Sequence, residues 1–103
     1  MRRKKIKRIY TRKPTRNLND PRYKEWRKSV YKRDRYNCQM TGCHYKGKRI
    51  NAHHIRKWAD FPHLRYDTNN GITLCYGCHK RVTGRELLFA PMLLDIINSK
   101  DKR

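Results

Sequence analysis

The chain has 103 residues, and its 28 Lys and Arg stand against only 8 Asp and Glu, which gives a formal net charge of +20. No apolar run approaches the roughly 18 residues of a membrane span, so we expect no membrane-spanning role. A chain this basic repels itself unless a polyanion is near, and it therefore predicts a nucleic-acid partner. A solubility role or an anionic membrane surface would also explain the charge.

The first nineteen residues contain no acidic residue, and nine of the first sixteen are Lys or Arg. With so few large apolar groups, this arm cannot form a core. We expect it to be disordered when free and to lie along a phosphate backbone when bound, although a solvated tail without a specific role is the alternative. The residues that we expect to contact nucleic acid are Arg2, Arg3, Lys4, Lys5, Lys7 and Arg8 in this arm, and Arg49, Arg56 and Lys80 beyond it.

A helix is expected to begin at Asp20 and Pro21, because Asp is a frequent N-cap and Pro suits the first helical position. Tyr23, Trp26 and Val30 then share one face at helical spacing. This apolar face is expected to pack into the core. The remaining faces carry Lys and Arg, which are available to a nucleic acid.

Two close cysteine pairs follow, Cys38 with Cys43 and Cys75 with Cys78. Each short spacing lets two thiolates reach one ion, so the two pairs predict a closed, structural zinc site. The opening segment MRRKKIKRIY is too charged for a secretory signal, and we expect a cytoplasmic setting in which paired cysteines favour zinc over disulfides. Four buried free thiols are the alternative, and His44 could compete with Cys43 as a ligand.

Short strands are expected at residues 48–55 (KRINAHHI) and 71–75 (GITLC), separated by a loop. A helix is expected over residues 78–90, although Gly84 weakens its middle. If the strands form a hairpin and the helix packs across it, His53 and His54 approach His79.

The C-terminal segment PMLLDIINSK is apolar enough to dock as a further helix or to pair with a second copy of the chain. Pro91 argues against one unbroken helix across this point. The expected organisation is therefore a basic arm over residues 1–19, a domain over 20–90, and a helix or tail over 91–103.

The series AHHI, NNGITLC and CYGCH, beside a four-cysteine knuckle, resembles the His-Asn-His (HNH) nuclease motif in its four-cysteine form. The likeness covers residues 26–83 and includes WRKSVYKRDRYNCQ and LRYDTNNGITLC. It implies an α+β fold: a small ββα-metal (His-Me finger) domain with a structural zinc knuckle, flanked by helices.

Carried over by position, the resemblance implies that His53 and His79 bind one catalytic divalent ion and that His54 is the general base. Asn70 would hold the loop so that His54 is correctly oriented. Mg²⁺ or Mn²⁺ is the expected ion, and imidazoles would also tolerate Ni²⁺ or Zn²⁺. Some relatives carry a further histidine where this chain has Thr83, so a third protein ligand from the last helix is missing.

The function that the resemblance implies is metal-dependent hydrolysis of DNA phosphodiester bonds, by nicking or by double-strand cleavage. Duplex DNA is the expected partner, and a homodimer is an open alternative. A zinc-stabilised nucleic-acid-binding module without catalysis would explain the charge equally well, and RNA cleavage is a third hypothesis.

Family analogy suggests a bacterial cell or a virus-infected host, and a mobile element or virus as the source. His44, His63, Asp60 and Asp67 are not expected to take part in the reaction. Trp58 is expected to anchor the loop.

Overall fold

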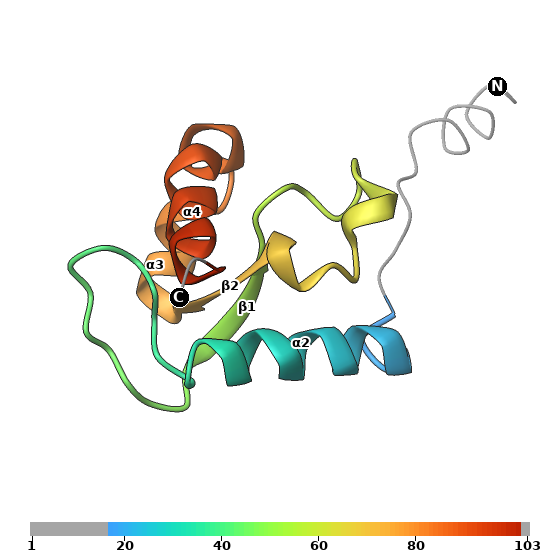
Figure 1. The fold of residues 1–103 in the computed structure, drawn as a ribbon, viewed down its shortest axis with the longest axis horizontal. Coiled ribbons are helices and arrows are strands. Elements are labelled where there is room, and N and C mark those ends of the chain that lie inside the picture. Colours follow the sequence, from blue (N-terminus) through green and yellow to red (C-terminus); the bar gives the residue numbers. More distant parts are fainter. Residues whose placement is uncertain (1–16, 102–103) are drawn as a thin grey trace, which may run out of the picture.

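The computed structural model describes residues 17–101, and the two long helices and the hairpin that it contains are seen in Figure 1. The elements in chain order are α2 (Pro21–Arg33), β1 (Ile50–His54), β2 (Gly71–Cys75), α3 (Tyr76–Val82) and α4 (Glu86–Asp101), with short 3-10 turns at Pro62–Leu64 and Thr68–Asn70. The strands pair antiparallel and α3 follows at once, so the expected small α+β fold of ββα order, flanked by helices, is confirmed. The predicted contacts of Arg2 to Arg8 lie outside the described residues.

Helix α2 begins as the sequence predicts. The Asp20 carboxylate accepts a hydrogen bond from the Arg22 backbone N–H at 2.8 Å, and Pro21 occupies the first turn. Trp26 and Val30 are the buried residues of this helix, at 2% and 0% exposure. The apolar stripe predicted from helical spacing therefore faces the hairpin.

The end of α2 is tied to β2 by a buried ion pair. The Arg33 guanidinium donates to the Asp34 carboxylate at 2.8 and 2.9 Å, and also to the carbonyl oxygens of Thr68 and Gly71 at 2.9 and 2.6 Å. The Asp34 carboxylate in turn accepts the backbone N–H of Thr73 at 2.9 Å. These bonds fix the position of β2 relative to α2.

The hairpin register decides where the adjacent histidines point. His54 pairs with Gly71 and His53 pairs with Ile72. Because successive side chains of a strand alternate between faces, the two histidines lie on opposite sides of the hairpin. One side is covered by α2 and the other by α3 and α4 (Figure 1). β1 is shorter than the predicted segment 48–55, whereas β2 has the predicted bounds.

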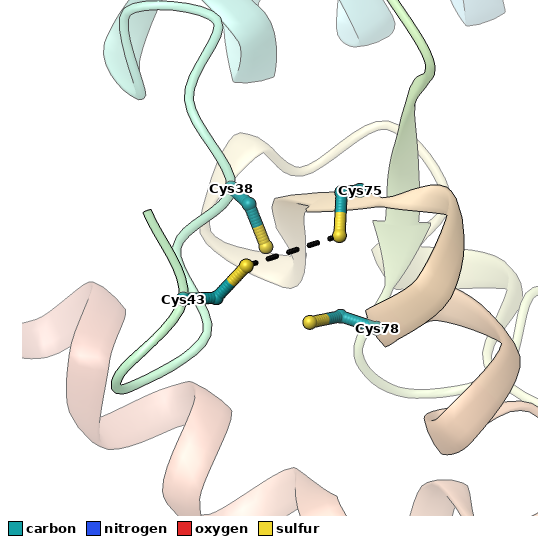
Figure 2. Close-up of side chains that lie close together, drawn as sticks. All are labelled: Cys38, Cys43, Cys75 and Cys78. Atoms are coloured by element: carbon teal, nitrogen blue, oxygen red, sulfur yellow. Dashed lines mark hydrogen bonds between the residues drawn. The ribbon is translucent and has the colours of Figure 1, made fainter. Parts of the chain in front are cut away.

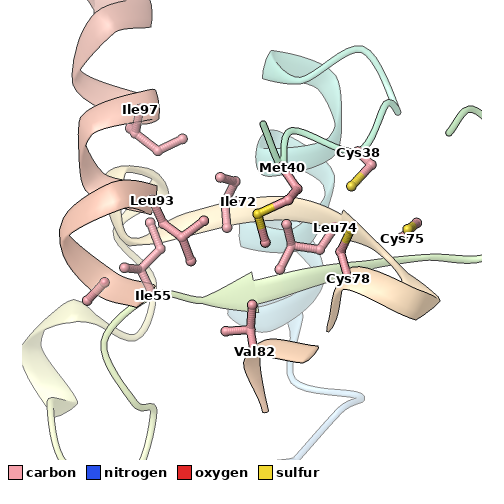
Figure 3. Packing of buried hydrophobic residues seen from close by; sticks show 11 residues of the cluster. Cys38, Met40, Ile55, Ile72, Leu74, Cys75, Cys78, Val82, Leu93 and Ile97 are labelled. Atoms are coloured by element: carbon pink, nitrogen blue, oxygen red, sulfur yellow. The ribbon is translucent and has the colours of Figure 1, made fainter. Parts of the chain in front are cut away.

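The main core lies between the hairpin and the C-terminal helices. Ile72 and Leu74 of β2 point into it, and Leu93 and Ile97 of α4 meet them from the other side (Figure 3). Met40, from the loop that carries the first cysteine pair, fills the space beside them. Both cysteine pairs border this cluster, so the expected metal site and the core are continuous.

The predicted single helix over 78–90 is wrong. α3 ends at Val82, Gly84 adopts a left-handed conformation with φ +86°, and α4 then continues through Pro91. Glycine at this point ends the first helix, and the burial of Leu93 and Ile97 stabilises the second despite the missing proline N–H. The domain boundary expected at residue 90 falls inside α4, and this helix docks on the core. Pairing of the chain with a second copy stays a prediction. Among the described residues no helix is long and apolar enough to cross a membrane.

Candidate active site and metal centre

The four cysteines gather at one place, as Figure 2 shows. Cys38 and Cys43 come from the loop after α2, Cys75 ends β2, and Cys78 lies in α3. Their sulfur atoms all lie within 4.8 Å of one another, and the Cys43 and Cys75 sulfurs are 3.9 Å apart. Four sulfurs bound at about 2.3 Å to one zinc ion lie ~3.8 Å apart. The cluster therefore fits a closed, structural zinc site, as the spacing predicts.

The thiols of this cluster differ in their acidity. Burial raises the pKa of Cys38 and of Cys78. Burial also acts to raise the pKa of Cys75, but hydrogen bonds from the Cys78 backbone N–H and from neighbouring thiols outweigh it and leave that pKa lowered. Thiols whose pKa is raised hold their protons, so zinc must displace protons to bind. Its affinity should therefore fall as the pH falls.

Local backbone structure positions the first cysteine pair. Gly42, with φ +84°, provides the left-handed residue of the turn in which the Cys43 N–H donates to the Met40 carbonyl at 2.9 Å. The Gln39 N–H donates to the Thr73 carbonyl at 2.9 Å, which attaches this turn to β2. The loop is thus held beside the strand that ends in Cys75.

His53 and His79 face each other between β1 and α3. Their ring centroids are 5.4 Å apart and their planes are inclined at 73°. His79 directly follows Cys78, so the cysteine cluster fixes the start of the helix that carries it. Two imidazoles this close can share one ion with metal–nitrogen bonds of about 2.0–2.1 Å. The described residues place no third His, Cys, Asp or Glu within the same ligand set, which leaves further positions to water or phosphate.

His54 lies on the other face of the hairpin and is held on two sides. Its ring stacks on the indole of Trp26, with centroids 3.9 Å apart and an interplanar angle of 9°. Its Nε2 lies 3.0 Å from the carbonyl oxygen of Arg65. Because a carbonyl only accepts, Nε2 carries the proton of a neutral ring and Nδ1 carries the lone pair. This tautomer is the one that can accept a proton at Nδ1, an atom that is buried in this structure.

Asn70 is buried and joins the two ends of the loop after β1. Its Oδ1 accepts the Arg56 N–H at 2.9 Å, and its Nδ2 donates to the Arg56 and Leu64 carbonyls at 3.1 and 3.4 Å. The backbone carbonyl of Asn70 accepts the Ile55 N–H at 2.9 Å. These are the contacts that the predicted loop-fixing role needs, since the loop includes Arg65, whose carbonyl meets His54.

The predicted basic contacts within the described residues lie beside two aromatic rings. Arg49 and Lys80 are exposed and lie over the ring of exposed Tyr76, at 5.0 and 5.5 Å. Arg56 is half-buried and lies 5.9 Å from the ring of Phe61. The sequence has no Asp or Glu over residues 35–59 or 68–85, so the hairpin and its surroundings present mainly cations.

The remaining loop residues have structural contacts. The Arg65 guanidinium lies 3.7 Å from the ring of Trp58 and donates to its carbonyl at 2.7 Å, which suits the predicted anchoring role. Asp67 caps the following turn by accepting the Asn69 N–H at 2.9 Å, and Asp60 is exposed. His44 and His63 are also exposed, and His63 lies near the ring of Phe61.

Two residues of the site, Trp26 and Gly71, were not identified from the sequence. Trp26 was expected only in the core, yet its ring covers His54. Gly71, which begins GITLC, leaves the space that this ring occupies. The spacing of Trp26 predicted its burial correctly, but no sequence signal identified which side chain it would meet.

The segment that carries the cysteines and the three histidines matches a known protein family. Residues 38–85 match the family model described as HNH endonuclease. The matched segment contains both cysteine pairs, the adjacent histidines, Asn70 and His79. No curated protein and no solved structure gave a match.

Proposed function

We propose that the protein hydrolyses the phosphodiester backbone of duplex DNA with the help of a divalent ion, because residues 38–85 match the family model described as HNH endonuclease and contain a four-cysteine cluster. The observation that carries the proposal is the facing pair His53 and His79, with the adjacent His54 on the opposite face of the hairpin. His53 and His79 face each other at 5.4 Å, and the adjacent His54 is held in the tautomer that has its lone pair on Nδ1.

His54 is the general base of the proposed reaction. Its Nδ1 takes a proton from water while the water oxygen bonds to phosphorus and the bond from phosphorus to the 3′ oxygen breaks. The departing 3′ oxygen takes up a proton from solvent, so the products are a 5′ phosphate and a 3′ hydroxyl. His53 and His79 would hold Mg²⁺ or Mn²⁺, and such an ion supplies charge stabilisation at the departing oxygen. Two neutral ligands would leave that ion exchangeable, and Ni²⁺ or Zn²⁺ would also suit imidazole nitrogens.

Asn70 orients the base from a distance. It closes the loop through Arg56 and Leu64, and the closed loop presents the Arg65 carbonyl to His54 Nε2. A base that is already oriented loses little freedom when the substrate binds, which lowers the barrier to proton transfer. The role proposed for Asn70 is therefore to position the base, without contact with the reacting atoms.

Zinc at the four cysteines has a structural role in this proposal. The cluster joins the loop after α2 to the junction of β2 and α3, and it fixes the turn that leads directly to His79. A small core alone gives limited stability, and a metal bound by four thiolates adds to it. Loss of zinc should therefore remove the catalytic ion site as well.

Arg49, Lys80 and Arg56 are proposed to contact phosphates, together with the basic arm. The absence of carboxylates over 35–59 and 68–85 favours a polyanion on this surface. Phosphate contacts position a protein without reading the sequence. We therefore expect broad cutting by the isolated protein.

Incubation of supercoiled plasmid with the purified protein tests the proposal. Mg²⁺ or Mn²⁺ should convert the plasmid to open circles or linear DNA, and EDTA should prevent it. Binding to DNA in a gel shift, without cleavage in any divalent ion, would favour the alternative of a zinc-stabilised binding module. Cleavage of RNA but not DNA would contradict the proposed substrate.

A further inference from the structure

We propose that Trp26 and Gly71 act together as positioning residues for His54, so that α2, which precedes the matched segment, completes the active site. The inference rests on the proposed function, because it concerns the orientation of the general base. It adds two residues to which neither the motif nor the family match gives a role.

The indole of Trp26 provides a fixed wall for the imidazole. The two rings are nearly parallel, at 9°, with centroids 3.9 Å apart. Trp26 is only 2% exposed, and its Nε1–H donates to the Asp67 carbonyl at 2.9 Å. A side chain that is buried and hydrogen-bonded cannot easily turn away, so the face of His54 against it is fixed too.

The Arg65 carbonyl and the Trp26 indole hold His54 in different ways. The Arg65 carbonyl fixes the edge of the ring at Nε2, and Trp26 fixes its plane. A hydrogen bond alone would allow the ring to tilt about the Nε2 contact. With the plane also fixed, the Nδ1 lone pair keeps one direction, which is the geometry that proton transfer needs.

Gly71 provides the space for this arrangement. It is the cross-strand partner of His54, and a Cβ at this position would lie 2.6 Å from Cζ2 of Trp26 and 2.5 Å from Cγ2 of Val30. Its φ of −124° is ordinary extended backbone, so the need for glycine here is steric. Any side chain at Gly71 must displace the indole or the strand.

The backbone at Gly71 has little room to retreat. The Arg33 guanidinium donates to the Gly71 carbonyl at 2.6 Å and to the Thr68 carbonyl at 2.9 Å, while it is paired with buried Asp34. An added methyl group would therefore push mainly on Trp26 and Val30. The position of the Trp26 indole therefore depends on the absence of a side chain at Gly71.

Gly71→Ala tests the proposal with Gly77→Ala as its matched control. Both changes add one methyl group, but a Cβ at Gly77 meets nothing within 4 Å. We expect kcat of Gly71→Ala on DNA to fall at least about 10-fold, with KM within about twofold of the wild type, since a misplacement of ~1 Å can cost ~100-fold. Gly77→Ala should keep both values. Equal kcat in the two variants would overturn the proposal.

A second measurement covers the case in which Gly71→Ala does not fold. Proton NMR of the His54 ring should show the upfield shift that an indole face produces, and Trp26→Phe should keep part of it and part of kcat. Trp26→Leu should lose both while zinc content and DNA affinity persist. His54 resonances that do not move in Trp26→Leu contradict the proposed contact. A wild type that shows the shift but never cleaves contradicts the proposed function and leaves the contact standing.

Discussion

The imidazole rings of His53 and His79 lie 5.4 Å apart at 73°, although one belongs to β1 and the other to α3. Their closeness arises because α3 begins directly after β2 and packs back over both strands, which brings His79 toward His53. The cysteine cluster fixes that junction. The thiolate site and the proposed catalytic ion site are therefore coupled through a few residues of backbone.

Replacement of His53 or His79 by Ala should remove the exchangeable ion without removing zinc. Each variant should lose at least about 100-fold in cleavage rate, equivalent to ~2.7 kcal/mol of barrier. Mn²⁺ titration followed by electron paramagnetic resonance should show weaker binding, while metal analysis still finds one zinc per chain. His63→Ala, an exposed loop histidine, is the control and should behave as wild type. Full Mn²⁺ affinity in both variants would contradict the assigned ligands.

Removal of zinc should unfold the domain. Structural zinc supplies on the order of 10 kcal/mol in comparable small domains. Cys78→Ser, or a strong chelator, should therefore abolish the cooperative thermal transition seen by circular dichroism. Because zinc binds thiolates, protons compete with zinc for Cys38 and Cys78, whose pKa burial raises; acid should therefore release zinc, and the stability that zinc supplies should be lost as pH is lowered. Unchanged melting after complete zinc removal would contradict this role.

Asn70→Asp should impair catalysis more than DNA binding. The carboxylate can still accept the Arg56 N–H, but it cannot donate to the Arg56 and Leu64 carbonyls. We expect kcat to fall at least about 10-fold and stability to fall by ~1–3 kcal/mol. The control is Asn69→Ala, since that side chain is exposed. Steady-state kinetics and thermal melts measure both effects, and wild-type kcat in Asn70→Asp would contradict the loop-fixing role.

Arg49→Gln and Lys80→Gln should each reduce the salt dependence of DNA binding. Every lost phosphate contact lowers the slope of log K against log salt by about 0.9. With one phosphate contact from each residue, the double variant should lose about twice as much. Titrations in EDTA measure affinity without cleavage. Slopes equal to wild type in Arg49→Gln and Lys80→Gln would exclude these two contacts.

Local chemistry explains what the sequence could predict. Cysteine spacing predicted the thiolate cluster, the Asp20–Pro21 pair predicted the start of α2, and β2 has the bounds predicted from GITLC. Each of these depends on a few neighbouring residues. The resemblance to the HNH motif also predicted the ββα order, which the hairpin and α3 confirm.

Tertiary contacts explain what the sequence could not predict. Pro91 was expected to interrupt the last helix, but α4 continues through it because Leu93 and Ile97 are fully buried against the hairpin. The contact between Trp26 and His54 depends on strand register and on the gap at Gly71. Helical periodicity predicts that Trp26 is buried, but it does not identify its neighbour.

The single-turnover rate of His54→Ala on plasmid DNA, at metal concentrations that saturate both variants, tests the central claim most directly. A positioned general base contributes about 10²–10⁴-fold, so the rate should fall by that factor while zinc content and DNA affinity stay as in the wild type. A variant that cleaves as fast as the wild type under these conditions would show that another group activates the water.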